Sequence, residues 1–223
     1  MLLSEKHVVV TGAGGALGRT AVDVARAQGA RVTLVDAVEV TARPGEQVLK
    51  LDLTDSAATM EALAALPAID ALFHITGGFT MGSPSHFIPD NEWSAMFAIN
   101  VTTLRNVVAA VVPGMVARGA GKLVTIGANA ALRGQAKMGA YCAAKASVMR
   151  LTESLSAELK GKGINVNGVL PTLIDTPKNR ADMPDADFST WVKPEDLANV
   201  ICFLGSDAAR AVHGVLLPVA GLL

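Results

Sequence analysis

A glycine-rich string directly after the first apolar run restricts the fold more than any other feature of the chain. The run His7–Thr11 is followed by Gly12-Ala13-Gly14-Gly15-Ala16-Leu17-Gly18, and the amphipathic segment Ala16–Gln28 opens inside that string. Glycines between a strand and a helix let the backbone approach a pyrophosphate, and a helix N-terminus offers free N–H groups and partial positive charge. Ordinary tight turns also use glycine. At this strand–helix junction we expect a dinucleotide site that includes Gly12, Gly15, Ala16 and Leu17.

Short apolar runs alternate with segments of helical periodicity along the rest of the chain. This alternation predicts βαβ crossovers, and the continuous apolar character of the runs predicts a parallel sheet covered on both faces. The sequence therefore predicts one α/β domain over residues 1–223, a Rossmann fold with a doubly wound, seven-stranded parallel sheet flanked by helices. After the first helix the expected segments are strands Arg31–Val35 and Gln47–Asp52, helix Ser56–Leu66, strand Ile69–Thr76, helix Glu92–Ala117, strand Lys122–Ile126, helix Gly139–Lys160, strand Ile164–Leu170, helix Pro194–Leu204 and a last strand near Gly214–Val219.

One irregular stretch, Thr172–Trp191, interrupts this pattern. It carries two prolines and several aspartates and is long for a simple connection. We expect it to form a lid over a ligand.

Composition excludes several function classes. The formal net charge is −1 and no run of Lys or Arg occurs, which argues against a nucleic-acid partner. The N-terminus does not resemble a signal peptide, and no uncharged apolar span of membrane length is apparent, so we expect a cytoplasmic protein without a membrane partner. The two cysteines and four histidines lack metal-ligand spacing, and no metal site is expected.

Two carboxylates follow the second and third predicted strands. Asp36 lies about twenty residues past the glycines, where a carboxylate can accept hydrogen bonds from an adenosine ribose and repel a 2′-phosphate. No Lys or Arg stands at position 15 or 37 to attract that phosphate, so NAD (NADH) is expected and NADP is less favoured. Asp36 could instead only cap a turn. Asp52, next to Leu53, could reach the adenine amino group or cap the following helix.

The only tyrosine, Tyr141, is followed by Lys145 at helical spacing i+4. An ammonium group beside a phenol is expected to lower the tyrosine pKa and make Tyr141 a proton donor or acceptor near neutral pH. A Tyr-x-x-x-Lys pair alone is often an ordinary surface pair. Together with the glycine turn, it indicates an oxidoreductase site.

With these motifs the whole chain resembles the short-chain dehydrogenase/reductase family. The resemblance implies that Tyr141 and Lys145 transfer the proton and hold the nicotinamide ribose, and that Asn100 holds a water of the proton relay. Asn100 could otherwise be a helix-bend residue, and Thr176 could be an N-cap. The remaining cofactor contacts that the resemblance implies are Thr76, Gly77 and Gly78 after the fourth strand, Ile126, and Pro171, Leu173 and Thr176 after the sixth.

A chemical departure occurs thirteen residues before Tyr141. The family has a serine there that hydrogen-bonds the substrate carbonyl, and this chain has Ala128. Losing such a donor can raise the barrier of a carbonyl reduction by about 2.7–4 kcal/mol.

The dihydropteridine reductase branch of the family shows the same departure. The string Asp175-Thr176-Pro177-Lys178-Asn179-Arg180, continued by Met183-Pro184-Asp185-Ala186-Asp187-Phe188-Ser189-Thr190-Trp191, is also similar to that branch. A quinonoid dihydropterin accepts hydride readily and then needs mainly a proton on a ring nitrogen, which Tyr141 could supply without a serine. Phe79 could stack on a flat pterin or act as a hydrophobic lid residue, and Phe79 and Ala128 are the expected substrate-facing residues.

The sequence thus predicts an NADH-dependent reductase of a quinonoid dihydropteridine, with a small-molecule substrate. Two alternatives stay open: an NAD(H)-dependent carbonyl reductase or alcohol dehydrogenase, and an NAD-binding protein with weakened catalysis. The apolar circumference of the helices Glu92–Ala117 and Gly139–Lys160 further predicts a homodimer or homotetramer.

Overall fold

A single parallel sheet of seven strands organises the protein. The computed structural model describes all residues from Met1 to Leu223. The strand order is β3-β2-β1-β4-β5-β6-β7, and every neighbouring pair is parallel. The strands are β1 His7–Thr11, β2 Arg31–Asp36, β3 Gln47–Lys50, β4 Ala71–His74, β5 Gly121–Ile126, β6 Ile164–Pro171 and β7 Leu216–Val219.

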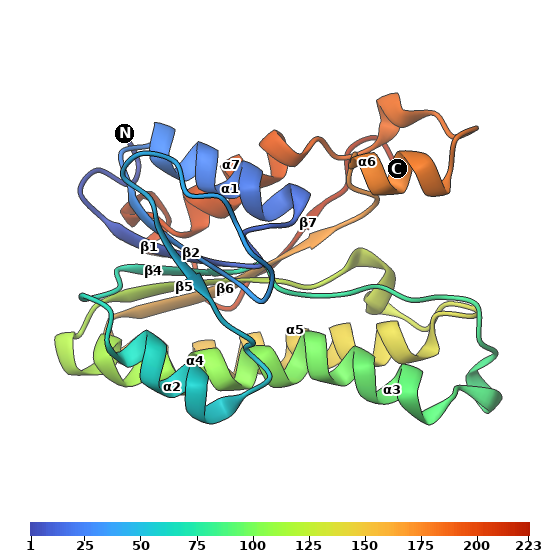
Figure 1. Cartoon of the computed structure of the whole chain (residues 1–223), viewed down its shortest axis with the longest axis horizontal. Helices are drawn as coiled ribbons and strands as arrows, with labels where there is room; N and C mark the ends of the chain where they lie inside the picture. The colour runs from blue at the N-terminus through green and yellow to red at the C-terminus, as the bar shows by residue number, and fades with distance from the viewer.

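Helices cover both faces of the sheet (Figure 1). Helices α1 (Ala16–Ala27) and α7 (Pro194–Leu204) pack against each other on one face. Helices α2 (Ser56–Ala64), α4 (Thr103–Arg118) and α5 (Gly139–Leu159) lie on the other. The predicted doubly wound α/β fold is confirmed. Its chain order reverses between β1 and β4, and in such sheets ligands bind at the carboxyl ends of the strands that flank the reversal.

The core follows from the alternation of side chains along each strand. Val8 and Val10 of β1 join the cluster under α1 and α7, while Val9 joins the cluster under α2 and α4. All three side chains are fully buried. A strand that is buried on both faces reads as a continuous apolar run, as β1 does.

The predicted helix Glu92–Ala117 is not continuous, and this prediction is wrong in one respect. The chain forms α3 (Asp90–Phe97), a π-helical turn at Ala98–Thr102, and then α4. Two side chains bond to backbone carbonyls around this turn: Asn100 Nδ2 donates to Met96 O at 3.0 Å, and Thr103 Oγ1 donates to Ile99 O at 2.7 Å. Such π-turns are frequent at functional sites.

Two connections between strands differ from the others. The predicted lid stretch Thr172–Trp191 is not a plain loop, because it contains α6 (Pro177–Asp182) and a 3₁₀ turn at Phe188–Thr190. Its base is closed by a bridge between Ile174 and Val192. The connection from β2 to β3, residues 37–46, has no helix at all. Strands β3, β4 and β7 are shorter than predicted, by one or two residues at an end.

Candidate active site

The glycine turn between β1 and α1 needs glycine at two positions. Gly12 has φ +68°, and a Cβ there would lie 2.8 Å from Thr76 N. At Gly18 a Cβ would lie 2.0 Å from Gly12 O, so this residue lets α1 approach the turn. The N-cap, Gly15, offers no side chain to the first helical N–H groups. The backbone N–H groups of Ala16 and Leu17 are therefore free to bind an anion.

Asp36, at the end of β2, lies against the same turn. Its Oδ2 accepts from Gly14 N at 2.8 Å and its Oδ1 accepts from Val38 N at 3.1 Å. Asp36 thus stabilises a turn, as the alternative interpretation has it. Each carboxylate oxygen can still accept a further bond, so the ribose role stays open.

Asp52 and Leu53 follow β3. Asp52 is exposed, and its Oδ1 accepts from the backbone and hydroxyl of Thr54 at 2.9 and 2.7 Å. The N-cap of α2 is Asp55, so the alternative that Asp52 caps this helix is wrong. The Leu53 side chain is buried, and its carbonyl accepts from the amide of Asn106 at 2.9 Å.

After β4 the chain passes close to the central helices. The Thr76 hydroxyl is buried and has no hydrogen-bond partner. A Cβ at Gly77 would lie 2.8 Å from Asn100 Oδ1 and 3.0 Å from Lys145 Nζ. Gly78 N donates to Asn100 Oδ1 at 3.2 Å, and Asn100 Nδ2 donates to Gly78 O at 3.1 Å. Asn100 therefore lies in a helix bend, as its alternative interpretation held, and it also fixes the loop that follows β4.

Lys145 is buried below this loop. Its Nζ donates to Ile126 O at the end of β5 at 2.9 Å. Burial lowers the lysine pKa from 10.5 to about 8. Below pH 8 the group is therefore a buried ammonium, and its two remaining protons face the space beside Gly77.

Tyr141 lies one helical turn before Lys145 and packs against Phe79. The two ring centroids are 4.9 Å apart with an interplanar angle of 80°. Burial raises the pKa of Tyr141 from 10.0 to about 12. The expected lowering of this pKa is thus wrong here, since desolvation of the phenolate dominates. At neutral pH the residue is a neutral phenol that can donate a proton.

Ala128 is buried beside Tyr141. It is 3% exposed and forms a small apolar cluster with Ala131, Met149 and Leu170, against which Tyr141 packs. No hydroxyl stands at this position.

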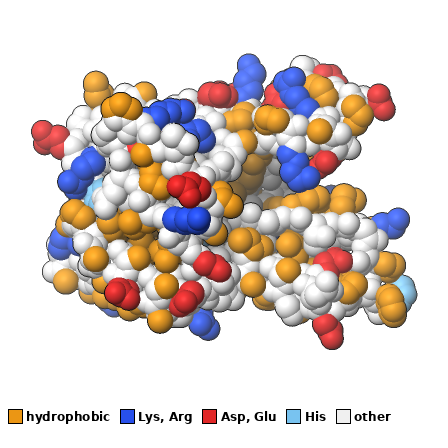
Figure 2. All heavy atoms as spheres, in the orientation of Figure 1, with side chains coloured by type: hydrophobic (Ala, Val, Ile, Leu, Met, Phe, Trp, Pro, Cys, Tyr) orange, Lys and Arg blue, Asp and Glu red, His pale blue; other side chains and the backbone are white.

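The last group of predicted contacts lies at the carboxyl end of β6. Pro171 ends the strand, and Leu173 O accepts from Val192 N at 2.9 Å. Thr176 is the N-cap of α6 and accepts from Asn179 N at 3.2 Å, as its alternative interpretation held. This segment leads into α6, which overhangs a hollow at the carboxyl end of the sheet (Figure 2).

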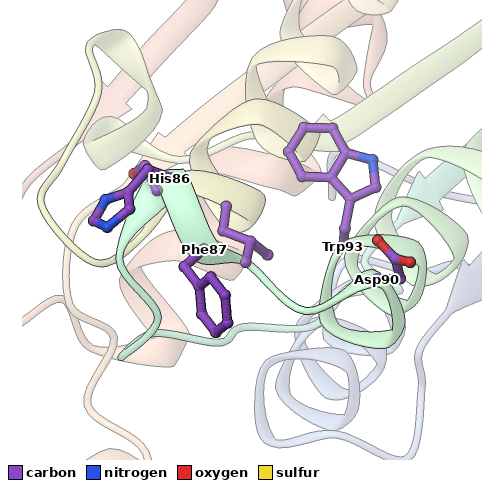
Figure 3. Close-up of a pocket in the computed structure, with 6 residues that line it drawn as sticks. His86, Phe87, Asp90 and Trp93 are labelled. Atoms are coloured by element: carbon purple, nitrogen blue, oxygen red, sulfur yellow. The ribbon is translucent and has the colours of Figure 1, made fainter.

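Two features were not found from the sequence. An open pocket of about 480 Å³ lies between the 3₁₀ turn Ser85–Phe87 and the start of α3, with Asp90 and Trp93 on its wall (Figure 3). A Cβ at Gly139 would lie 2.8 Å from Ser85 Oγ, so this pocket adjoins the helix of Tyr141. Nothing in the sequence periodicity separates these residues from an ordinary loop.

The second feature is His74, at the end of β4. Its Nδ1 is 3.0 Å from Thr11 Oγ1, and its Nε2 is 3.4 Å from Thr103 Oγ1. Burial, assisted by the charge of Lys145, lowers the His74 pKa from 6.5 to about 3. The ring is therefore neutral and ties β1 and β4 to the helix that carries Asn100.

These residues fit a nicotinamide dinucleotide. The uncapped α1 N-terminus suits a pyrophosphate, and the orphaned Thr76 hydroxyl has a free hydrogen-bonding position after β4. Gly77 leaves room beside Asn100 and Lys145 that any side chain would fill. The fold brings all of these groups to the carboxyl ends of β1, β4 and β5.

Comparison with known proteins identifies the family. The family model described as short chain dehydrogenase matches residues 6–187. The chain belongs to the short-chain dehydrogenase family. It is 29% identical to L-xylulose reductase from Bos taurus, over 98% of this chain and 96% of the relative.

Two solved structures of the family are closely similar. A gluconate 5-dehydrogenase from Burkholderia cenocepacia in complex with NADP and tartrate has a TM-score of 0.90 and 27% identity, over 98% of this chain and 95% of that one. Carveol dehydrogenase from Mycobacterium avium in complex with NAD has a TM-score of 0.86 and 27% identity, over 99% of this chain and 98% of that one. The chain is accordingly an NAD(P)-dependent oxidoreductase. These relatives are named for L-xylulose, gluconate and carveol, and none of the three is a dihydropteridine reductase.

Proposed function

We propose that this short-chain dehydrogenase reduces a flat, electron-poor conjugated ring, of the class of quinonoid dihydropterins, with NADH as reductant. The observation that carries the proposal is Ala128. Its methyl group is buried against Tyr141, at the position where the family's serine polarises a carbonyl. A substrate that is already electron-poor does not depend on that donor, because hydride addition leaves mainly a ring nitrogen to be protonated.

The proton comes from Tyr141 in this proposal. A nicotinamide dinucleotide held by the glycine turn and by Lys145 would supply the hydride to the substrate ring. Tyr141, with a pKa of about 12, is a neutral phenol across the physiological range and donates its proton. Lys145 is charged below pH 8 and stabilises the phenolate that remains, and Asn100 fixes the loop at Gly78 next to it. By the family resemblance, a water held by Asn100 would return the proton to Tyr141.

Phe79 supplies a wall for a flat substrate. Its side chain is 57% exposed and packs against Tyr141 in a T-shaped arrangement with a centroid distance of 4.9 Å. An exposed aromatic face beside the proton donor suits stacking on a planar ring. Pro171, Leu173 and Thr176 are assigned to the nicotinamide side of the same site.

The preference for NADH rests on Asp36. Its carboxylate is fixed by two backbone N–H groups and points a negative charge at the turn that receives the adenosine. A 2′-phosphate there meets like charge, whereas two ribose hydroxyls find acceptors. Gly12, Gly15, Ala16 and Leu17 hold the pyrophosphate, while Asp52 and Leu53 lie on the adenine side.

A second candidate is the oxidoreduction of a simple carbonyl or alcohol. It is supported by the relatives, which are named for L-xylulose, gluconate and carveol. The buried methyl of Ala128 argues against it.

A two-substrate comparison separates the candidates. We expect wild-type protein to reduce a quinonoid dihydropterin with a higher kcat/KM than L-xylulose. Ala128→Ser should leave the pterin reaction unchanged and raise the ketone reaction by up to about 100-fold, which is the lower end of one donor's contribution. Tyr141→Phe should lower pterin reduction by about 100-fold or more, with NADH affinity near wild type.

Two results would overturn the proposal. If wild-type protein does not reduce the pterin but reduces ketones well, the second candidate is supported. Wild type that binds NADH and turns over no substrate from a panel of pterins, quinones and ketones is an NAD-binding protein with weakened catalysis.

A further inference from the structure

The connection from β2 to β3 is the only one between neighbouring strands in chain order that lacks a helix. Its ten residues, 37–46, run beside α1 as a plain tube (Figure 1). Parallel strands are usually joined by a dozen residues or more, most often through a helix. A segment this short and without helical hydrogen bonds must be held by side chains.

Glu46 is the centre of that attachment. Its side chain is fully buried, yet it carries a carboxylate. The carboxylate accepts from Arg19 Nη1 at 3.2 Å, from Arg26 Nη1 at 3.1 Å and from Arg43 N at 2.8 Å. Burial alone would raise the pKa of Glu46, but these donors outweigh it and the pKa is lowered. Glu46 is therefore ionised and forms ion pairs with two arginines of α1.

The same two arginines also hold the backbone of the connection. Arg19 Nη2 donates to Thr41 O at 3.2 Å, and Arg26 Nη2 donates to Pro44 O at 3.0 Å. A separate ion pair joins Arg43 to Asp23 of α1. Both Nη atoms of Arg19 and of Arg26 thus make hydrogen bonds to the connection, and these bonds orient each guanidinium toward it.

The connection reaches the glycine turn at its other end. A Cβ at Gly14 would lie 3.1 Å from Asp36 Oδ2, 3.1 Å from a methyl of Val40 and 3.3 Å from a methyl of Val38. The two valines therefore lie over the point where Asp36 meets the turn. Arg19, on the first turn of α1, bonds to the residue directly after Val40. The network and the adenosine end of the site are parts of one local structure.

We propose that Glu46 reinforces the nucleotide preference set by Asp36, because it keeps Arg19 in an ion pair. With Glu46 in place, Arg19 is held in an ion pair, and the side chains over the turn, Val38 and Val40, are apolar. Without it, Arg19 becomes a free guanidinium beside the adenosine ribose, where it can pair with a 2′-phosphate. Glu46 is thus a positioning residue, and the inference rests on the NADH preference proposed above.

The test measures nucleotide binding directly, by calorimetry with NADH and NADPH in the absence of substrate. Wild type should bind NADH more tightly. Glu46→Gln keeps the shape and an acceptor for Arg43 N, and should improve NADPH affinity relative to NADH by about 10-fold, the effect of one hydrogen bond to a charged group. The double variant Glu46→Gln with Arg19→Met should lose that gain.

Two further variants make the result decisive. Asp207→Asn is a matched control, since Asp207 pairs with Lys6 and Lys122 at the opposite end of the sheet, and it should leave the affinity ratio unchanged. Arg19→Met alone should also leave the affinity ratio unchanged, because Glu46 already holds this arginine away from the nucleotide. This variant tests the inference even if Glu46→Gln does not fold.

Several outcomes would overturn the inference. The first is an equal loss of affinity for NADH and NADPH in Glu46→Gln. The second is a gain in NADPH affinity that persists in the double variant without Arg19. The third is weaker NADPH binding in Arg19→Met alone. Wild type that binds neither nucleotide would instead refute the proposed function, so the two failures are distinguishable.

Discussion

Lys145 is the residue whose environment sets the expected pH dependence of the proposed reaction. Burial lowers its pKa to about 8, whereas Tyr141, with a pKa of about 12, keeps its proton over the accessible range. The ammonium that stabilises the phenolate is therefore lost as pH rises through 8. We expect kcat/KM for reduction to be flat from pH 6 to 7.5 and to fall about tenfold per pH unit above 8.5. An inflection near pH 10 instead would show that Lys145 has an ordinary pKa.

His74 gives a second prediction at the same scale, for stability. Its pKa is about 3 in the folded protein and 6.5 in the unfolded chain. Between pH 6.5 and pH 3, therefore, only the unfolded chain binds a proton at this ring. The His74 contribution is therefore fully present above pH 6.5 and is lost as pH falls toward 3. Compared with His74→Asn, wild type should lose up to about 1.4 kcal/mol of unfolding free energy per pH unit in this window. Urea denaturation at several pH values measures the difference, and parallel curves for the two proteins would contradict it.

Residue types and spacing predicted the site better than they predicted its electrostatics. The glycine turn, Asp36, Tyr141 and Lys145 are predicted from local motifs, and Asn100 is predicted from the family resemblance. The raised Tyr141 pKa was not, since it depends on burial. His74 and Glu46 were missed for a related reason. Their partners are 29 to 63 residues away for His74 and 20 to 27 residues away for the arginines on Glu46, and no local pattern marks such pairs.

At the level of elements, periodicity located all seven strands and the main helices. It failed where side chains replace backbone hydrogen bonds. The π-turn at Ala98–Thr102 leaves the apolar period of the helix nearly intact, so the sequence reads as one helix. The sequence also did not predict α6, because its six residues are too few to show a helical period. Thr176 and Pro177 are nevertheless a typical helix start.

The stretch Thr172–Trp191, which we expect to act as a lid, offers a prediction of its own. Arg180 of α6 forms a bidentate pair with Asp175 and lies 4.7 Å over the ring of Phe188, so one side chain joins three parts of the lid. We expect Arg180→Met to raise the substrate KM about 10-fold with little change in melting temperature, because a solvent-exposed ion pair adds little to the free energy of unfolding. Lys178→Met is the matched control, since Lys178 pairs only with Asp182 of the same helix and should have wild-type KM. Equal effects of the two variants would show that Arg180 does not organise the lid.

At the scale of the whole molecule, one helical run stands out. Residues Asp90–Arg118, which include α3, the π-turn and α4, have a mean hydropathy of 1.6 over their most apolar window, and 39% of that window is buried in the protein. By length and composition alone this run could cross a membrane. However, α2 packs along it, and Val107, Val111 and Met115 belong to the core beneath the sheet, as in a core helix. The run also carries exposed apolar side chains, Trp93 and Val116, which are available to a partner.

We expect that partner to be a second copy, with α4 and α5 pairing across a two-fold axis. Leu151 of α5 is half-buried and packs in none of the apolar clusters of its own chain, so its side chain is available to a neighbour. Burying such faces twice at a symmetric interface stabilises a dimer by removing apolar surface from water. Light scattering at micromolar concentration should give a dimer or tetramer for wild type and a smaller species for Leu151→Lys. Val38→Lys, at a 60% exposed side chain on the β2–β3 connection, should assemble as wild type does. A monomeric wild type would refute the interface, whereas assembly unaffected by Leu151→Lys would place the contact on another face.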